Sequence, residues 1–139
     1  IRPCILRLGT VYGASDRPRY DLVVNLFSGL IANKKEITIN GGKQWRPFIH
    51  VKDVAAANIL AATADIPEEY YGQVFNIGSS DSISIQEIAN LISDDQVYIP
   101  KREGEMETTF ANIDKAKEIL GWTPKINVSD WIRKQILPK

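Results

Sequence analysis

The sequence has only one cysteine and one histidine among its 139 residues. A lone cysteine, Cys4, excludes a disulfide within the chain, and its apolar neighbours indicate a thiol buried in a strand rather than a reactive one. The scarcity of both residue types, with no close cluster of carboxylates, leaves no convincing metal site. Apolar runs are only a few residues long, against the roughly 20 that span a bilayer, and the first residues lack a signal-peptide pattern. We therefore expect a cytoplasmic protein with no membrane partner.

Charge of one sign is also missing, because 17 basic residues offset 17 acidic ones. A balanced chain has no basic field to hold a nucleic-acid backbone, so we expect no nucleic-acid partner. Any anion must instead be bound locally by a few side chains. With 44% apolar residues, the chain can bury the core of one ordinary domain.

Strand and helix patterns alternate along the chain, which predicts an α/β fold with too few strands for a complete doubly wound sheet. Strands are expected at residues 4–8, 37–39, 48–51, 74–77 and 97–99, the first and fourth of them in the interior of a parallel sheet. Helices are expected at residues 21–33, 53–63, 84–92, 114–120 and 128–136.

Several residues have the positions of helix caps. Ser84 and Glu87, three apart, predict a capping box at the start of the best-signalled helix. The other predicted N-caps are aspartates, namely Asp21, Asp53 and Asp114.

Four segments, in this order, carry a resemblance to a known family: residues 6–13 (LRLGTVYG), 46–55 (RPFIHVKDVA), 74–78 (VFNIG), and 102–105 (REGE) with 120–124 (LGWTP). With these motifs the chain resembles the extended short-chain dehydrogenase/reductases, specifically the NAD-dependent nucleotide-sugar epimerases and dehydratases. The resemblance spans nearly the whole chain. It implies that residues 1–139 are the C-terminal, substrate-binding portion, made of part of a Rossmann-like parallel sheet and the small substrate-binding subdomain. The N-terminal dinucleotide-binding half is then absent from this sequence.

The same resemblance implies that no catalytic residue lies in this chain. No tyrosine is followed four residues later by a lysine, and the phosphate-cradling Gly-x-x-Gly-x-x-Gly turn is missing. His50 is interpreted as a structural histidine, because the family does not use this position as an acid or base. We therefore expect the complete enzyme, as a homodimer, to use NAD or NADP, and the chain alone to be inactive and to bind neither.

The implied substrate is a nucleotide-diphosphate sugar. Its diphosphate carries two negative charges, which a planar guanidinium can bind bidentately and a lysine ammonium cannot. Arginines matching Arg46 and Arg102 contact the diphosphate in the family, and the acidic residue matching Glu105 contacts the ribose. Residue type alone would instead favour two solvated surface arginines.

The remaining implied contacts are with the sugar, the base and the cofactor. Thr10 stands where many family members have an asparagine near the sugar, and its hydroxyl is shorter than that amide but can also donate and accept hydrogen bonds. Asn25 could supply an amide from the opposite wall or be an ordinary polar helix position. Gly9 lies where the backbone passes the nicotinamide. The segment that flanks the nucleotide base is implied to be Thr38, Ile39 and Asn40.

Two other functions stay open. A binding or scaffold module could keep the sugar-nucleotide cleft without redox chemistry, and a reductase of the same superfamily could act on a small carbonyl compound. The pair of arginines, Arg46 and Arg102, argues against the reductase, whose substrate has no diphosphate.

Overall fold

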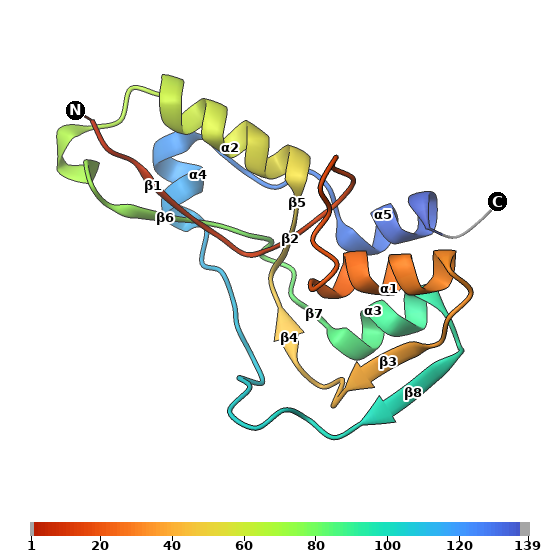
Figure 1. The fold of residues 1–139 in the computed structure, drawn as a ribbon. Helices are drawn as coiled ribbons and strands as arrows, with labels where there is room; N and C mark the ends of the chain where they lie inside the picture. Colours follow the sequence, from red (N-terminus) through yellow and green to blue (C-terminus); the bar gives the residue numbers. More distant parts are fainter. Residues whose placement is uncertain (1, 137–139) are drawn as a thin grey trace.

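The computed structural model describes residues 2–136 and shows two groups of packed helices and strands (Figure 1). The first group contains strands β1 (Ile5–Leu8) and β6 (Val74–Ile77) with helices α2 (Val51–Thr63) and α4 (Asp114–Leu120). The second contains strands β3 (Ile37–Asn40) and β8 (Gln96–Ile99) with helices α1 (Val23–Ala32), α3 (Ile85–Ile92) and α5 (Val128–Gln135). A single 3₁₀ turn, η1 (Glu68–Tyr70), precedes β6.

Short strands connect the two groups. Strands β2 (Thr10–Tyr12) and β5 (Phe48–His50) pair in parallel, and β4 (Trp45–Arg46) pairs antiparallel with β7 (Ile83–Ser84). The pairs β1–β6 and β3–β8 are also parallel. The three parallel pairs, each joined through intervening helices, agree with the predicted α/β class.

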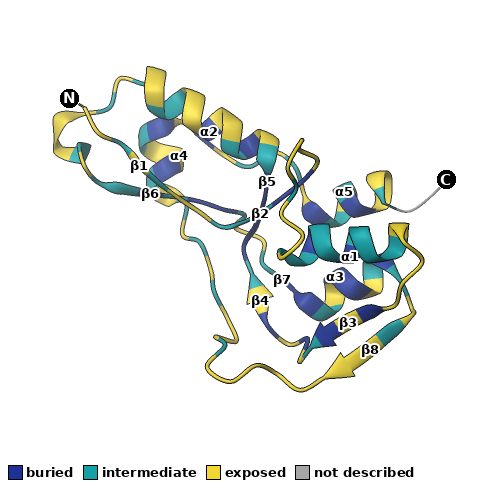
Figure 2. Cartoon of the chain, viewed as in Figure 1, coloured by how far each residue is buried: buried dark blue, intermediate teal, exposed yellow. Residues whose placement is uncertain are grey.

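Each group has its own apolar core, and Figure 2 shows the buried positions on the inward faces of the helices. In the second group, Phe27 of α1 and Ile88 of α3 pack against β3, whose Ile37 and Ile39 are buried. In the first, Phe75 of β6 packs with residues of α2 and α4. Within residues 2–136, every helix is too short or too polar to cross a bilayer.

Strand β1 is the main difference from the expected interior strands. Ile5 is 48% exposed and Leu8 is 45% exposed, while Cys4 is half-buried. Among the described residues β1 pairs only with β6, so its other edge has no neighbour. Partial burial nevertheless raises the pKa of the Cys4 thiol, which lowers its reactivity at neutral pH.

The predicted capping box of α3 is present, because Glu87 N–H donates to Ser84 Oγ at 3.1 Å and Ser84 N–H donates to Glu87 Oε2 at 2.9 Å. The three aspartate caps are wrong. Asp21 pairs with Arg19 at 2.6 Å, and α1 begins without a side-chain cap.

The other two aspartates lie inside the first turns of their helices. His50 caps α2, since its Nδ1 accepts the Lys52 N–H at 3.1 Å. The buried Asp53 instead accepts the Ile126 N–H at 3.0 Å and so ties α2 to the distant C-terminal segment. Asp114 donates its own N–H to Asn112 Oδ1 at 2.9 Å.

Candidate functional site

A cavity of about 200 Å³ lies between α1, β3 and the loop that follows β8. Six of the nine predicted site residues line it: Thr10, Thr38, Asn40, Arg46, Arg102 and Glu105. Thr38 and Asn40 reach it together because side chains two apart point to the same face of a strand. The cavity therefore joins residues that are up to 95 positions apart in the sequence, from Thr10 to Glu105.

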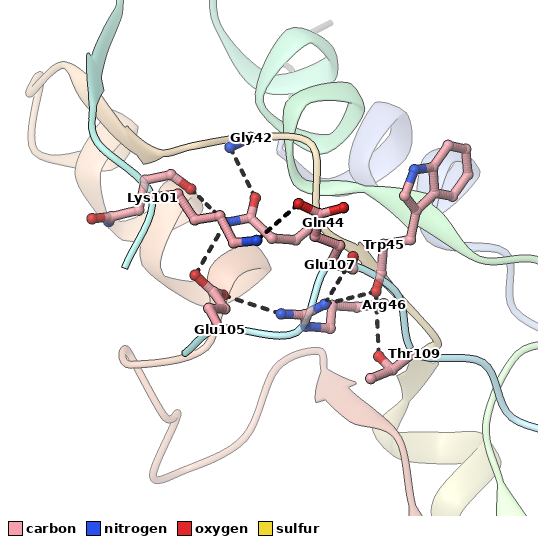
Figure 3. A network of polar contacts seen from close by, with 9 residues as sticks. Gly42, Gln44, Trp45, Arg46, Lys101, Glu105, Glu107 and Thr109 are labelled. Atoms are coloured by element: carbon pink, nitrogen blue, oxygen red, sulfur yellow. Dashed lines mark hydrogen bonds and ion pairs between the residues drawn. The ribbon is translucent and has the colours of Figure 1, made fainter. Parts of the chain in front are cut away.

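Arg46 is held in a network of polar contacts (Figure 3). Its Nη2 donates to Glu105 Oε1 at 3.1 Å, in an ion pair whose side chains are 19% and 29% exposed. Its Nη1 donates to the carbonyl of Trp45 at 2.9 Å and to that of Glu107 at 3.4 Å. These contacts use three of the five N–H donors of a guanidinium, so two donors are left for a ligand.

The loop that carries Glu105 is fixed against β4. Trp45 N–H donates to the Glu107 carbonyl at 2.7 Å, and Thr109 N–H donates to the Trp45 carbonyl at 3.2 Å. Lys101 pairs with the Glu107 carboxylate at 2.9 Å and lowers the pKa of that group. These contacts place Arg102 and Glu105 at the same cavity as Arg46.

The other three predicted site residues, Ile39, Asn25 and Gly9, do not line this cavity. Ile39 is 0% exposed in the core beneath β3, on the face opposite to Thr38 and Asn40, so it offers no surface to a base in this structure. Asn25 lines a neighbouring cavity of about 350 Å³ and accepts the Gly13 N–H at 3.4 Å. Its amide also donates to the Arg19 carbonyl at 3.3 Å, a contact that joins α1 to the loop before it.

Gly9 lies at the junction of β1 and β2, outside the lining of the Arg46 cavity. A Cβ at this position would overlap the carbonyl oxygen of Pro47. The Gly9 N–H donates to the Ile77 carbonyl at 2.8 Å, so the backbone is held close on both sides. This close approach gives a packing reason for glycine here.

A buried amide and an apolar wall of the cavity were not predicted from the sequence. Gln44 is the amide, and the other lining residues are Asp21, Leu22, Val23, Leu26, Phe27, Phe48 and Ile85. Leu22, the N-cap of α1, and Leu26 are four residues apart, a spacing that places their side chains on one face of the helix. The spacing could not indicate that this face borders a cavity, because the cavity exists only once β3 and α3 are in place.

His50 is away from the cavity, in an aromatic cluster. Its ring centroid lies 5.1 Å from that of Tyr12 and 5.8 Å from that of Trp131. Burial lowers the pKa of His50; Asp53 opposes this effect and Lys52 adds to it, and the net lowering favours the neutral ring. These surroundings and its helix-capping bond support the structural interpretation of this histidine.

The first 78 residues match the model of the NAD dependent epimerase/dehydratase family, and the chain belongs to this family. The chain is 31% identical, over 144 aligned residues, to a putative UDP-glucose 4-epimerase of Methanocaldococcus jannaschii. The alignment covers 98% of the chain and 45% of that protein. The chain is also 29% identical to a UDP-glucuronate 4-epimerase of Thermodesulfobacterium geofontis, covering 95% of the chain and 41% of that protein. The chain therefore spans less than half the length of these relatives.

Solved structures give the same result. The UDP-glucose 4-epimerase of Thermotoga maritima, in complex with UDP-glucose, matches with a TM-score of 0.79 at 29% identity, over 96% of this chain and 47% of that one. The UDP-glucuronic acid 4-epimerase of Bacillus cereus, in complex with UDP-glucuronic acid and NAD, matches with a TM-score of 0.81 at 28% identity. This match covers 96% of the chain described here and 43% of the epimerase. These matches confirm the family resemblance and the Rossmann-like α/β class.

Proposed function

We propose that this chain forms the nucleotide-sugar-binding side of an NAD-dependent epimerase or dehydratase, and that its cavity holds the nucleoside diphosphate. The observation that carries the proposal is the convergence of Arg46 and Arg102 on one cavity. Two guanidinium groups can neutralise the two charges of a diphosphate and bind its oxygens in a defined geometry. The UDP-sugars bound by the similar solved structures support the same ligand class.

The lining of the cavity suits the rest of a nucleotide. Leu22 and Leu26, both partly exposed, provide an apolar wall for a base, and Thr38 and Asn40 offer hydrogen-bonding groups beside it. We assign Glu105 to the ribose hydroxyls, since a carboxylate accepts hydrogen bonds from hydroxyl groups. We assign the sugar to the Thr10 end of the cavity.

The cofactor needs residues that this chain does not supply. The sequence has neither the Tyr-x-x-x-Lys pair nor a phosphate-cradling glycine turn. We assign to Gly9, whose backbone packs against the Pro47 carbonyl, only a backbone contact beside the nicotinamide. When bound in the whole protein, NAD would supply the oxidation of a sugar carbon. We propose that a further segment of the natural protein holds it and covers the exposed apolar residues Ile5 and Leu8 of β1.

The size of the cavity supports a site that is completed by another segment. Ligand pockets typically measure about 300–1,000 Å³. The cavity in this chain is about 200 Å³, so it can enclose only part of a nucleotide sugar. A reductase of small carbonyl compounds fits less well, because its substrate has no diphosphate for Arg46 and Arg102 to bind at this cavity.

Calorimetric titration of the full natural chain with UDP and with uridine tests the proposal. Replacing Arg46 or Arg102 by alanine is expected to weaken UDP binding by about 1.5–3 kcal/mol each, the range for hydrogen bonds to charged groups, and to change uridine binding little. Arg133→Ala is the matched control, because Arg133 is exposed on α5, lies outside the lining of the cavity and pairs with Asp130 at 3.4 Å. Unchanged UDP affinity in both cavity variants would rule out the diphosphate site.

Conversion of a UDP-sugar by the same full chain separates an enzyme from a binding module. The epimerase or dehydratase predicts a changed sugar product in the presence of NAD. UDP binding without any conversion across a panel of UDP-sugars would instead favour the binding or scaffold module.

A further inference from the structure

Gln44 is a buried amide that joins separate parts of the cavity wall. It is 2% exposed and lies in the turn between β3 and β4. Its Oε1 accepts the Gly42 N–H at 2.8 Å, and its Nε2 donates to the Asn40 carbonyl at 2.8 Å and to Glu105 Oε2 at 3.0 Å (Figure 3). One amide thus uses both of its N–H donors and its carbonyl oxygen.

The two carboxylate oxygens of Glu105 have different partners. Gln44 binds Oε2, and Arg46 binds Oε1 at 3.1 Å. Because Gln44 fixes one oxygen, the carboxylate cannot rotate away, and the other oxygen stays directed at the guanidinium. The chain of contacts runs from Gln44 through Glu105 to Arg46.

We propose that Gln44 is a positioning residue of the nucleoside-diphosphate site, acting through Glu105 on the guanidinium of Arg46, a role that rests on the proposed function. A guanidinium that is already oriented loses less conformational freedom when the diphosphate binds, which increases affinity. The role requires an amide. A glutamate here would lose the donors and place a second carboxylate about 3 Å from the first, where like charges repel.

The test is Gln44→Glu in the full natural chain, titrated with UDP and with uridine at pH 7.5 and at pH 5. We expect UDP affinity at pH 7.5 to fall about tenfold, the equivalent of one lost charge-assisted hydrogen bond. Uridine should lose less, because it can contact Glu105 through its ribose but has no diphosphate for Arg46. At pH 5 the difference from the unchanged protein should narrow, because a protonated carboxyl at position 44 can donate to Glu105 again. Gln73→Glu is the matched control. Gln73 donates to the Glu69 carbonyl at 2.6 Å and does not line the cavity.

A second variant covers the case in which Gln44→Glu fails to fold. Gln44→Met keeps the length of the side chain without its hydrogen bonds, and it should weaken UDP binding when Arg46 is present. In an Arg46→Ala background the same change should have a clearly smaller further effect on UDP binding, limited to the contact of Glu105 with the ribose. An equal additional loss in that background would overturn the inference.

The outcomes separate the two proposals. If the unchanged protein binds UDP and the Gln44 variants bind it equally well, the positioning role is wrong and the diphosphate site stands. Equal losses for UDP and uridine would also overturn the positioning role, because they indicate a general collapse of the cavity. If the unchanged protein does not bind UDP, the proposed function fails and the positioning role fails with it.

Discussion

Ser84→Ala offers a sharp test of how local contacts hold this fold. The Ser84 hydroxyl accepts the Glu87 N–H at 3.1 Å and lies 2.6 Å from Glu87 Oε2, to which it donates. Alanine removes both contacts and leaves a backbone donor of the first turn of α3 without its partner. Loss of an N-cap of this kind costs about 0.5–2 kcal/mol. We expect the free energy of unfolding to fall by that amount, as measured by urea denaturation of the full natural chain.

The capping box also predicts a dependence on pH. The hydrogen bonds from the Ser84 side chain and backbone lower the pKa of Glu87 below its ordinary 4.5 in the folded protein. A lowered pKa in the folded state means that the stabilisation is present above pH 4.5 and is lost as the pH falls through the lowered value. The stability difference between the unchanged protein and Ser84→Ala should therefore shrink on acidification below pH 4.5.

Ser28→Ala is the matched control for both measurements. Ser28 lies inside α1, and its hydroxyl donates to the Val24 carbonyl at 2.6 Å, a bond that does not cap the helix. Alanine is a better helix former, so this change should cost much less stability. Two results would refute the reasoning about the cap. One is an equal loss of stability from Ser84→Ala and Ser28→Ala, and the other is a stability loss from Ser84→Ala that does not change with pH.

Three further changes have defined outcomes. Gly9→Ala should destabilise the full natural chain by about 1–3 kcal/mol in urea denaturation, because the new methyl group would overlap the Pro47 carbonyl, and wild-type stability would contradict the packing explanation. Trp122→Phe should lose about 1–3 kcal/mol by the same measurement, because it removes the 2.9 Å hydrogen bond from the buried indole to the Asp53 carbonyl, and a neutral effect would show that this contact is dispensable. Arg46→Lys should give a calorimetric UDP affinity between those of the unchanged protein and Arg46→Ala, whereas full recovery would show that charge alone suffices.

Much of the fold could be predicted because helix caps and short apolar strands are determined by residues close together in the sequence. The capping box at Ser84 and the apolar strand at residues 74–77 depend on neighbouring residues, and both are present. The end of α4 at Gly121, in the left-handed conformation with φ of 64°, was also expected from sequence. Two of the predicted aspartate caps have other partners for their carboxylates, the distant Ile126 N–H for Asp53 and the neighbouring Arg19 for Asp21.

The site could be predicted in part. The resemblance pointed to Arg46, Arg102 and Glu105, which the structure brings to one cavity, although their roles stay predictions. The resemblance did not indicate that Ile39 points away from the cavity while Thr38 and Asn40 line it. Which face of a strand is buried depends on where the helices pack. Gln44 had no signal in the sequence, since a glutamine reveals its role only through its buried partners.

The most direct test of the central claim is a crystal structure of the full natural chain with UDP. The account predicts the diphosphate in the cavity beside β3, with its oxygens within hydrogen-bonding distance of the guanidinium groups of Arg46 and Arg102. UDP bound at another site, or bound in this cavity with both guanidinium groups turned away from the phosphates, would contradict it.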